Sequence, residues 1–264
     1  MTESTPDRAR AAEILLQAYA SGTPTAPLTE QFDGLTVEDA YAIQLAQVRQ
    51  WTDGGRRIIG HKVGLTSAAM QKQLGVDQPD FGHLTDDFAH LEHEAIPLGS
   101  YLQPRVEPEI AFVLRKPLTG PGITVTQAID AVDYVLPALE VVDSRVADWK
   151  ITLVDTIADN ASSGGFVLGS TPTRLADVDL RLTGCVFSRN SQVVGTGAGG
   201  AVLGSPITSL VWLANTVGAL GTTLEAGHVI LPGSVTSMVP VAPGDVFTAT
   251  FAGLGSVTAR FADK

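Results

Sequence analysis

Apolar side chains recur at helical spacing through the first fifty residues. Residues 11–18 repeat them every three or four positions, and this run ends before Gly22 and Pro24. A second run begins at Val37, directly after Thr36, a residue type that caps helix N-termini. The pattern predicts a helical N-terminal arm over residues 1–55.

From about residue 56 the pattern changes to short β-type runs separated by Gly and Pro. Strands are predicted at 57–63, 106–114, 134–142, 164–168, 180–188, 228–231, 246–251 and 256–261. Two helices interrupt them, one after Thr126 as N-cap and one that begins at Ser205 and Pro206 and ends at Gly221. No repeat or linker divides the chain. We expect an α+β fold in which residues 56–264 form one continuous β-rich domain.

Composition narrows the class of protein. With 44% hydrophobic and 17% charged residues among 264, the chain is expected to fold around a core without disulfides. A net charge of −11 without a basic cluster argues against nucleic acid as a partner. The single cysteine, Cys185, suits a reducing compartment. The most apolar stretch, 207–220, is too short and too polar to cross a bilayer, so we expect a cytoplasmic protein without membrane contact.

Two glutamates lie two residues apart in one predicted strand. Residues at that spacing share a face, so the Glu107 and Glu109 carboxylates point the same way, about 7 Å apart. Ala111 and Val113 continue this face, which indicates that it enters the interior. Two like charges in an interior repel each other and lose hydration unless a cation neutralises them. Pro108 cannot donate a ladder hydrogen bond, which predicts an edge, end or bulge here.

A third glutamate, Glu140, stands alone in the apolar run 134–142, where an unpaired carboxylate would be costly to bury. Three carboxylates would suit a hard divalent ion, Mg²⁺ or Mn²⁺, better than zinc. The alternative is that these glutamates form ordinary ion pairs with arginines such as Arg105 and Arg145. Spacing alone leaves both interpretations open.

Lys62 lies in an apolar strand flanked by glycines, which predicts close approach by another group. It could bind a carboxylate or transfer protons, or be an ordinary surface lysine. Asp80, in the turn-rich segment 75–84, could act as an acid or base, or cap a turn. We interpret His61 and His83 as polar packing residues.

Residues 155–165 gather small polar side chains and glycines in one loop. Such a loop can present backbone N–H groups and hydroxyls to a carboxylate. It can equally be a structural turn.

The order of these segments resembles that of the 2-hydroxypenta-2,4-dienoate (2-keto-4-pentenoate) hydratases. Six separated motifs match in order, and so does a segment near the C-terminus; they lie at 60–67, 75–82, 104–110, 137–145, 148–150, 155–163 and 253–257. That family belongs to the fumarylacetoacetate hydrolase superfamily. The resemblance implies a mixed-sheet core of the C-terminal-domain type and a divalent metal held by carboxylates.

Residue by residue, the resemblance implies roles for the groups singled out above. Glu107, Glu109 and Glu140 match the family's ligands for Mg²⁺ or Mn²⁺, Lys62 its lysine, and Asp80 its acid/base aspartate. The positions that it implies for substrate binding are Leu84, Asn160, Ser162 and Ser163.

The implied reaction is hydration of a 2-hydroxydienoate, with the enolate charge stabilised by the metal and water added at C4. Lys62 and Asp80 would move the protons, in a division of roles that the sequence leaves open. An uncharged substrate tail is favoured because no second concentrated basic site is visible. The resemblance also implies a homo-oligomer, with a pathway decarboxylase or aldolase as a further possible partner.

Three alternatives remain. A 4-oxalocrotonate-type decarboxylase shares the metal triad and the lysine, but that branch tends to carry an apolar residue where this chain has Asp80. A C–C hydrolase would add a His/Glu pair, whereas His61 faces away from Lys62 on a strand. From a different class, the chain could be a non-catalytic scaffold that partners such a decarboxylase.

Overall fold

The computed structural model describes residues 7–67, 71–72, 76 and 78–263, so part of the turn-rich segment predicted at 75–84 lies outside the described residues. Three helices precede the first strand: α1 (Arg8–Ser21), α2 (Leu28–Gln31) and α3 (Val37–Asp53). Thr36 caps α3 as predicted, and its capping box with Asp39 satisfies N–H groups in the first turn. The boundary predicted after residue 55 falls in the short connection to the first strand.

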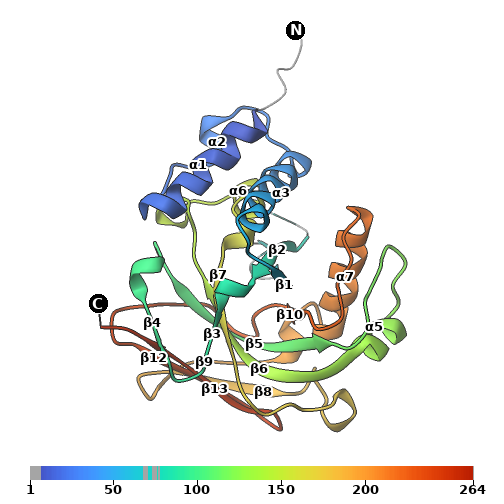
Figure 1. The fold of residues 1–264 in the computed structure, drawn as a ribbon. Helices are drawn as coiled ribbons and strands as arrows, with labels where there is room; N and C mark the ends of the chain where they lie inside the picture. Colours follow the sequence, from blue (N-terminus) through green and yellow to red (C-terminus); the bar gives the residue numbers. More distant parts are fainter. Residues whose placement is uncertain (1–6, 68–70, 73–75, 77, 264) are drawn as a thin grey trace.

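Two β-sheets lie face to face below these helices (Figure 1). The larger sheet has the order β2-β1-β10-β5-β6-β7-β3, and β11 pairs with β5. Its strands are β1 (Ile58–Gly64), β2 (Asp80–Thr85), β3 (Ala89–His90), β5 (Arg105–Leu114), β6 (Val132–Val142), β7 (Ser163–Leu168), β10 (Val229–Leu231) and β11 (Val239–Pro240). Because β1 runs parallel to β10 while β5 and β6 are antiparallel, this sheet is mixed.

The smaller sheet has the order β4-β13-β12-β8-β9. Its strands are β4 (Ala95–Ile96), β8 (Gly184–Arg189), β9 (Gln192–Ala198), β12 (Val246–Phe251) and β13 (Gly255–Phe261). All eight predicted strands are present. Five strands were not predicted: β2, β3, β4, β9 and β11. The strands β3, β4 and β11 have only two residues each and so show no periodicity, while β2 and β9 contain glycine or turn residues.

The main core lies between the two sheets. Phe112 of β5, Phe187 of β8 and Phe247 of β12 are all fully buried in one apolar cluster. Two helices extend it, α5 (Val125–Ala131) and α7 (Pro206–Ala219). The predicted start of α5 was wrong: Thr124 is the N-cap rather than Thr126, because Gln127 lies at the third helical position from Thr124 and closes a capping box.

By length and mean hydropathy alone, residues 199–219, which include α7, could cross a membrane. In the fold, however, Leu210, Leu213, Ala214 and Val217 of α7 are completely buried in the main core. This is the pattern of a core helix.

The N-terminal helices pack on α6 (Leu153–Ala158) through a separate apolar cluster. Two buried glutamines of α3 bind the elements next to it. Gln44 donates its amide to the carbonyls of Phe81 and Ile157 at 2.9 and 2.8 Å, and Gln47 donates to that of Ala158 at 2.7 Å. The arm therefore anchors β2 and α6, both of which contribute side chains to the site described next.

Candidate metal and substrate site

Glu107, Glu109 and Glu140 converge between two neighbouring strands. Glu107 lies directly opposite Glu140 in the β5–β6 register, and one carboxylate oxygen from each of the three glutamates lies within 4.8 Å of the others. On the other side of β5, described strands pair only with its ends, β11 at Val106 and β10 at Phe112. The local edge predicted from Pro108 is confirmed, and it leaves Glu107 open to a cavity.

The burial and mutual repulsion of these three glutamates favour the binding of a cation. Burial and then the charge of Glu140 raise the pKa of Glu107 to about 7. Burial and then the neighbouring glutamates raise the pKa of Glu109, and burial raises that of Glu140. Glu109 accepts the Gly233 N–H at 2.8 Å through Oε2, but its Oε1 and both oxygens of Glu140 accept no hydrogen bond from the described residues. Three hard oxygen donors with spare lone pairs fit a divalent cation.

The two arginines proposed as alternative partners bind elsewhere. Arg145 pairs with Asp159 at 2.6 Å and lies 3.7 Å from Asp143. The Arg105 guanidinium lies over the Trp149 ring, 4.5 Å from its centroid. Among the described residues, neither arginine forms an ion pair with the glutamates. The arginine-pairing interpretation was therefore wrong.

Lys62 supplies the only cation that the described residues bring into ion-pair contact with the triad. Its Nζ lies 3.5 Å from Glu140 Oε1 and donates a hydrogen bond to the Ala161 carbonyl at 2.9 Å. Burial lowers the pKa of Lys62, but Glu140, Asp80 and the other glutamates together outweigh it and raise that pKa above its usual value. With 3% of its surface exposed, Lys62 is not an ordinary surface lysine.

Asp80 begins β2 opposite Gly64 of β1, so it reaches Lys62 through strand pairing rather than by capping a turn. It is buried, its Oδ2 accepts a hydrogen bond from Thr156 Oγ1 at 3.0 Å, and burial raises its pKa. A side chain at position 64 would collide with Asp80 and come within 3.1 Å of Lys62 Nζ. The glycine next to the lysine therefore makes room for Asp80, in agreement with the predicted close approach.

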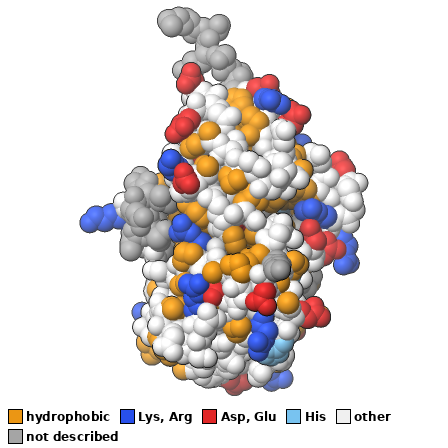
Figure 2. All heavy atoms as spheres, turned by 90° about the vertical axis from the view of Figure 1, so that its left-hand side faces the viewer, with side chains coloured by type: hydrophobic (Ala, Val, Ile, Leu, Met, Phe, Trp, Pro, Cys, Tyr) orange, Lys and Arg blue, Asp and Glu red, His pale blue; other side chains and the backbone are white. Residues whose placement is uncertain are grey.

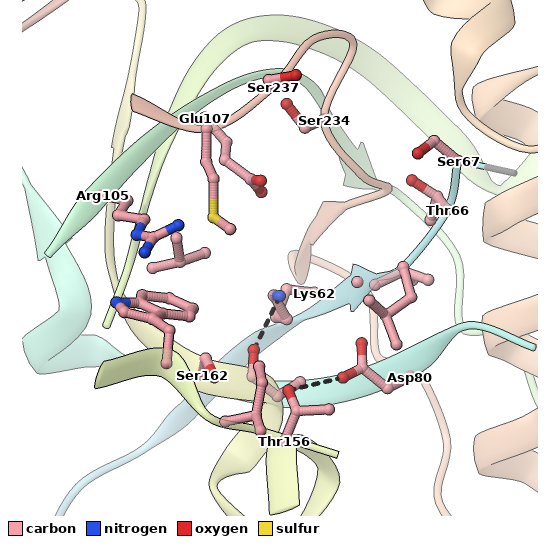
Figure 3. Close-up of a pocket in the computed structure, with 18 of the residues that line it drawn as sticks. Lys62, Thr66, Ser67, Asp80, Arg105, Glu107, Thr156, Ser162, Ser234 and Ser237 are labelled. Carbon is pink, nitrogen blue, oxygen red and sulfur yellow. Dashed lines mark hydrogen bonds between the residues drawn. The ribbon is translucent and has the colours of Figure 1, made fainter. Parts of the chain in front are cut away.

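Lys62, Asp80 and Glu107 line one cavity of about 730 Å³ (Figure 3). Lys62 lies near its centre, Glu107 above and Asp80 to one side. Apolar side chains, among them Trp149, Ile151, Val235 and Met238, form part of its wall, and hydroxyl groups line another part at Thr66, Ser67, Ser162, Ser234 and Ser237. Sequence reasoning missed the 233–238 segment, although the Pro-Gly-Ser turn after a predicted strand was a signal that it could have used.

The four residues implied for substrate binding lie in different places. Ser162 lines the cavity together with the Ala161 backbone. The Asn160 side chain accepts the His83 N–H at 2.8 Å and donates to the His83 carbonyl at 2.9 Å. Ser163 Oγ donates to the Asn160 carbonyl at 2.7 Å. Leu84 is buried in an apolar cluster. Of these, only Ser162 lies on the cavity wall; Asn160, Ser163 and Leu84 support that wall from behind.

A buried arginine holds the turn that presents the Ala161 carbonyl to Lys62. Asn160, Ala161 and Ser162 adopt left-handed backbone angles, with φ values of 52°, 51° and 53°. The Arg145 guanidinium donates to the carbonyls on either side of this turn, those of Asp159 and Ser163, at 3.0 Å each. Three successive left-handed residues are unfavourable for side chains other than glycine, so this network stabilises a strained segment of the site.

Comparisons with known proteins agree with this arrangement. Residues 61–262 match the fumarylacetoacetate (FAA) hydrolase C-terminal family. The chain is 51% identical over 254 residues to a 2-keto-4-pentenoate hydratase of Paraburkholderia xenovorans (strain LB400), covering 96% of this chain and 94% of that protein. It is 45% identical to a 2-hydroxyhexa-2,4-dienoate hydratase of Comamonas testosteroni, over 94% of this chain and 95% of that protein.

A solved structure resembles the whole fold. It is 4-oxalocrotonate decarboxylase from Pseudomonas putida G7 complexed with magnesium and adipate, with a TM-score of 0.93 and 38% sequence identity over 98% of this chain and all of that chain. The predicted α+β fold with N-terminal helices and a mixed-sheet core is confirmed. The chain belongs to the fumarylacetoacetate hydrolase C-terminal family and, within it, to the family of the 2-keto-4-pentenoate hydratases.

Proposed function

We propose that this protein is a metal-dependent hydro-lyase that adds water to 2-hydroxypenta-2,4-dienoate, or to an analogue with a longer tail, to give a 4-hydroxy-2-oxo acid. This places it in the meta-cleavage breakdown of aromatic compounds or steroids. The observation that carries the proposal is that Glu107, one of three converging glutamates, lines the same cavity as Lys62 and Asp80. Relatives named as hydratases at 51% and 45% identity support the reaction class.

In this proposal Glu107, Glu109 and Glu140 hold Mg²⁺ or Mn²⁺. The bound ion supplies Lewis-acid stabilisation of the negative charge that develops on the substrate's 2-oxygen. The free lone pairs of the buried carboxylates support this assignment, and the decarboxylase of similar fold carries magnesium.

Lys62 and Asp80 have different roles in this proposal because they differ in charge. Lys62 is held as a cation by Glu140 and Ala161, which suits it to bind an anionic oxygen of the substrate. Burial raises the pKa of Asp80, which favours uptake of a proton that it can exchange with the carbon chain or with the attacking water. The Thr156 hydroxyl orients Asp80 for this exchange.

A turnover assay tests the proposal against its closest alternative, the decarboxylase. We expect Mg²⁺- or Mn²⁺-dependent loss of dienol absorbance with 2-hydroxypenta-2,4-dienoate, and no release of CO₂ from 4-oxalocrotonate. Asp80→Asn should abolish hydration while the metal still binds, because the carboxamide cannot transfer the proton. Absence of metal-dependent loss of absorbance, or efficient CO₂ release by the wild-type protein, would exclude the hydratase assignment. Inactivity toward both substrates would favour a scaffold.

We also propose that the protein acts in the cytoplasm as a homo-oligomer and associates there with a pathway decarboxylase or aldolase. In this proposal Val186 and Val193 of the smaller sheet, which are 44% and 62% exposed, lie in the contact between copies of the chain. Hydrophobic side chains also reach the surface across the middle of the face in Figure 2, between interspersed acidic and basic ones. Sedimentation of the purified protein, alone and mixed with a decarboxylase, tests this part.

A further inference from the structure

Arg105 differs from the other basic residues near the site, because it lines the cavity and forms no ion pair among the described residues. It lies two positions before Glu107 on β5, so both side chains share one face of the strand. Figure 3 shows its guanidinium directed into the cavity beside Glu107. A cation in this position has donor groups available for a ligand.

The surroundings of Arg105 hold the guanidinium in place. Its Cζ lies over the Trp149 ring, 4.5 Å from the centroid, and the Trp149 Nε1 donates to the Gln103 carbonyl at 3.1 Å. The Arg105 backbone is paired on both sides, with Val142 of β6 and Pro240 of β11. The N–H groups of a guanidinium lie in its own plane, so they can meet a carboxylate in two parallel hydrogen bonds at its edge.

The charges around the cavity indicate what this guanidinium receives. Four carboxylates, those of Asp80 and the three glutamates, face the cation Lys62. Even with a divalent ion in the triad, the ionised site would carry one excess negative charge and would repel an anionic substrate. Asp148, which also lines the cavity, is paired with Lys150 at 3.4 Å, and Arg105 offsets the remaining negative charge. It is therefore suited to make binding of an acid favourable.

We propose that Arg105 binds the C1 carboxylate of the substrate, so that the carbon chain runs from the glutamate triad toward Asp80. This inference rests on the proposed function and identifies how the site orients its substrate. Figure 3 places Arg105 and Asp80 on opposite sides of the cavity with Lys62 between them. With C1 at Arg105, the distal carbons C4 and C5 lie on the Asp80 side, where water and a proton are to be added.

Calorimetry with two unreactive probes tests this orientation. 2-Oxopentanoate carries the carboxylate and the 2-oxygen but has no double bond to hydrate, and 2-oxopentanamide lacks the negative charge. In Mg²⁺-loaded protein, Arg105→Met should raise the Kd of the acid by at least about tenfold and change that of the amide less than about twofold. Arg105→Lys should lie between wild type and Arg105→Met. The Kd for Mg²⁺ itself should be unchanged, and in turnover KM should rise more than kcat falls.

Lys150→Met is the matched control, because it removes a nearby exposed cation that pairs with Asp148 at 3.4 Å. It should leave both affinities unchanged. An unaltered Kd of the acid in Arg105→Met, an equal loss for acid and amide, or failure of the wild-type protein to bind the acid would each overturn the inference. If the wild type hydrates no dienoate but still binds 2-oxopentanoate through Arg105, the proposed reaction fails and the carboxylate assignment stands.

Discussion

Single residues determine which groups can meet at this site. Gly64 is an example, because the absence of a side chain there leaves the space in which Asp80 approaches Lys62. Gly233 is a second, since its N–H binds Glu109 while its backbone, with φ of 125°, passes close to Thr66. Neither glycine carries chemistry, yet both shape the charged cluster.

Gly64→Ala should reduce kcat by at least about tenfold and destabilise the fold by about 1–3 kcal/mol, because the new methyl group displaces the Asp80 carboxylate. Turnover and urea unfolding measure the two effects. Gly184→Ala is a matched control, since a methyl group at that strand position would meet no atom closer than 4.0 Å. Equal activity of both variants would show that Asp80 does not need its present position.

Glu107→Gln should abolish metal binding and turnover while leaving the fold largely intact. The substitution removes one charge from a buried, mutually repelling cluster, so the metal-free variant should be at least as stable as metal-free wild type. Calorimetric titration with Mg²⁺ and Mn²⁺ and thermal unfolding check this. Near-normal activity of the variant would refute the ligand assignment.

At the scale of elements, β1 presents different chemistry on its two faces. Lys62 reaches the cavity, whereas the neighbouring His61 packs against His83 of β2 and His228, with ring centroids 4.8 and 5.7 Å apart. Both nitrogens of the buried His61 ring lack a hydrogen-bond partner among the described residues. The histidines are thus packing residues, as interpreted from the sequence, and they join the strands that bring Lys62 and Asp80 together.

Acid should loosen this strand pair. Burial lowers the pKa of His83 to about 4 and also lowers that of His61, so unfolding below pH 6.5 takes up protons. The stability that the neutral rings contribute is complete above pH 6.5 and is lost as the pH falls toward 4. His83→Gln should flatten the pH dependence of the unfolding free energy by up to about 1.4 kcal/mol per pH unit in this window. Superimposable slopes for wild type and variant, measured by urea unfolding, would contradict this.

At the scale of the whole molecule, the β-rich core forms the site and the N-terminal arm supports it from outside. The arm packs on α6 and binds β2 through Gln44, and these elements carry Thr156 and Asp80. The two-sheet core positions the glutamates from the other side. All residues that line the cavity belong to the core, and the arm supports two of the elements that carry them.

The stability of the whole protein should depend jointly on metal binding and on pH. The folded pKa of Glu107 is raised from 4.5 to about 7, so metal-free protein should lose stability as the pH rises through this window. In the proposed site a divalent ion would bind the ionised carboxylates, so its stabilising effect should grow over the same range. At a hundred times Kd it should reach about 2.7 kcal/mol.

Thermal unfolding with and without Mg²⁺ between pH 5 and 8 measures this linkage. Glu107→Gln is the control, and it should show almost no shift. A shift in wild type that is independent of pH, or one of equal size in Glu107→Gln, would show that the metal binds elsewhere.

The spacing of residues in the sequence was enough by itself to predict some of these features. Period-two alternation placed Glu107 and Glu109 on one interior face of a strand, and helical spacing with capping residues located α3 and α7. These inferences succeed because side-chain direction follows from backbone geometry within a few residues. The order and identity of several motifs were also enough to identify the family, because such a resemblance can be recognised in the sequence without coordinates.

Only tertiary structure decided which distant groups meet. The β5–β6 register places Glu140 opposite Glu107, the β1–β2 pairing places Asp80 beside Lys62, and Arg145 turns away from the triad to hold the 160–162 turn. Strand register depends on contacts between segments far apart in the chain, so no local pattern encodes it. The same cause explains why spacing left open an ion pair between Arg105 and a glutamate, whereas the fold places Arg105 at the cavity without an ion pair among the described residues.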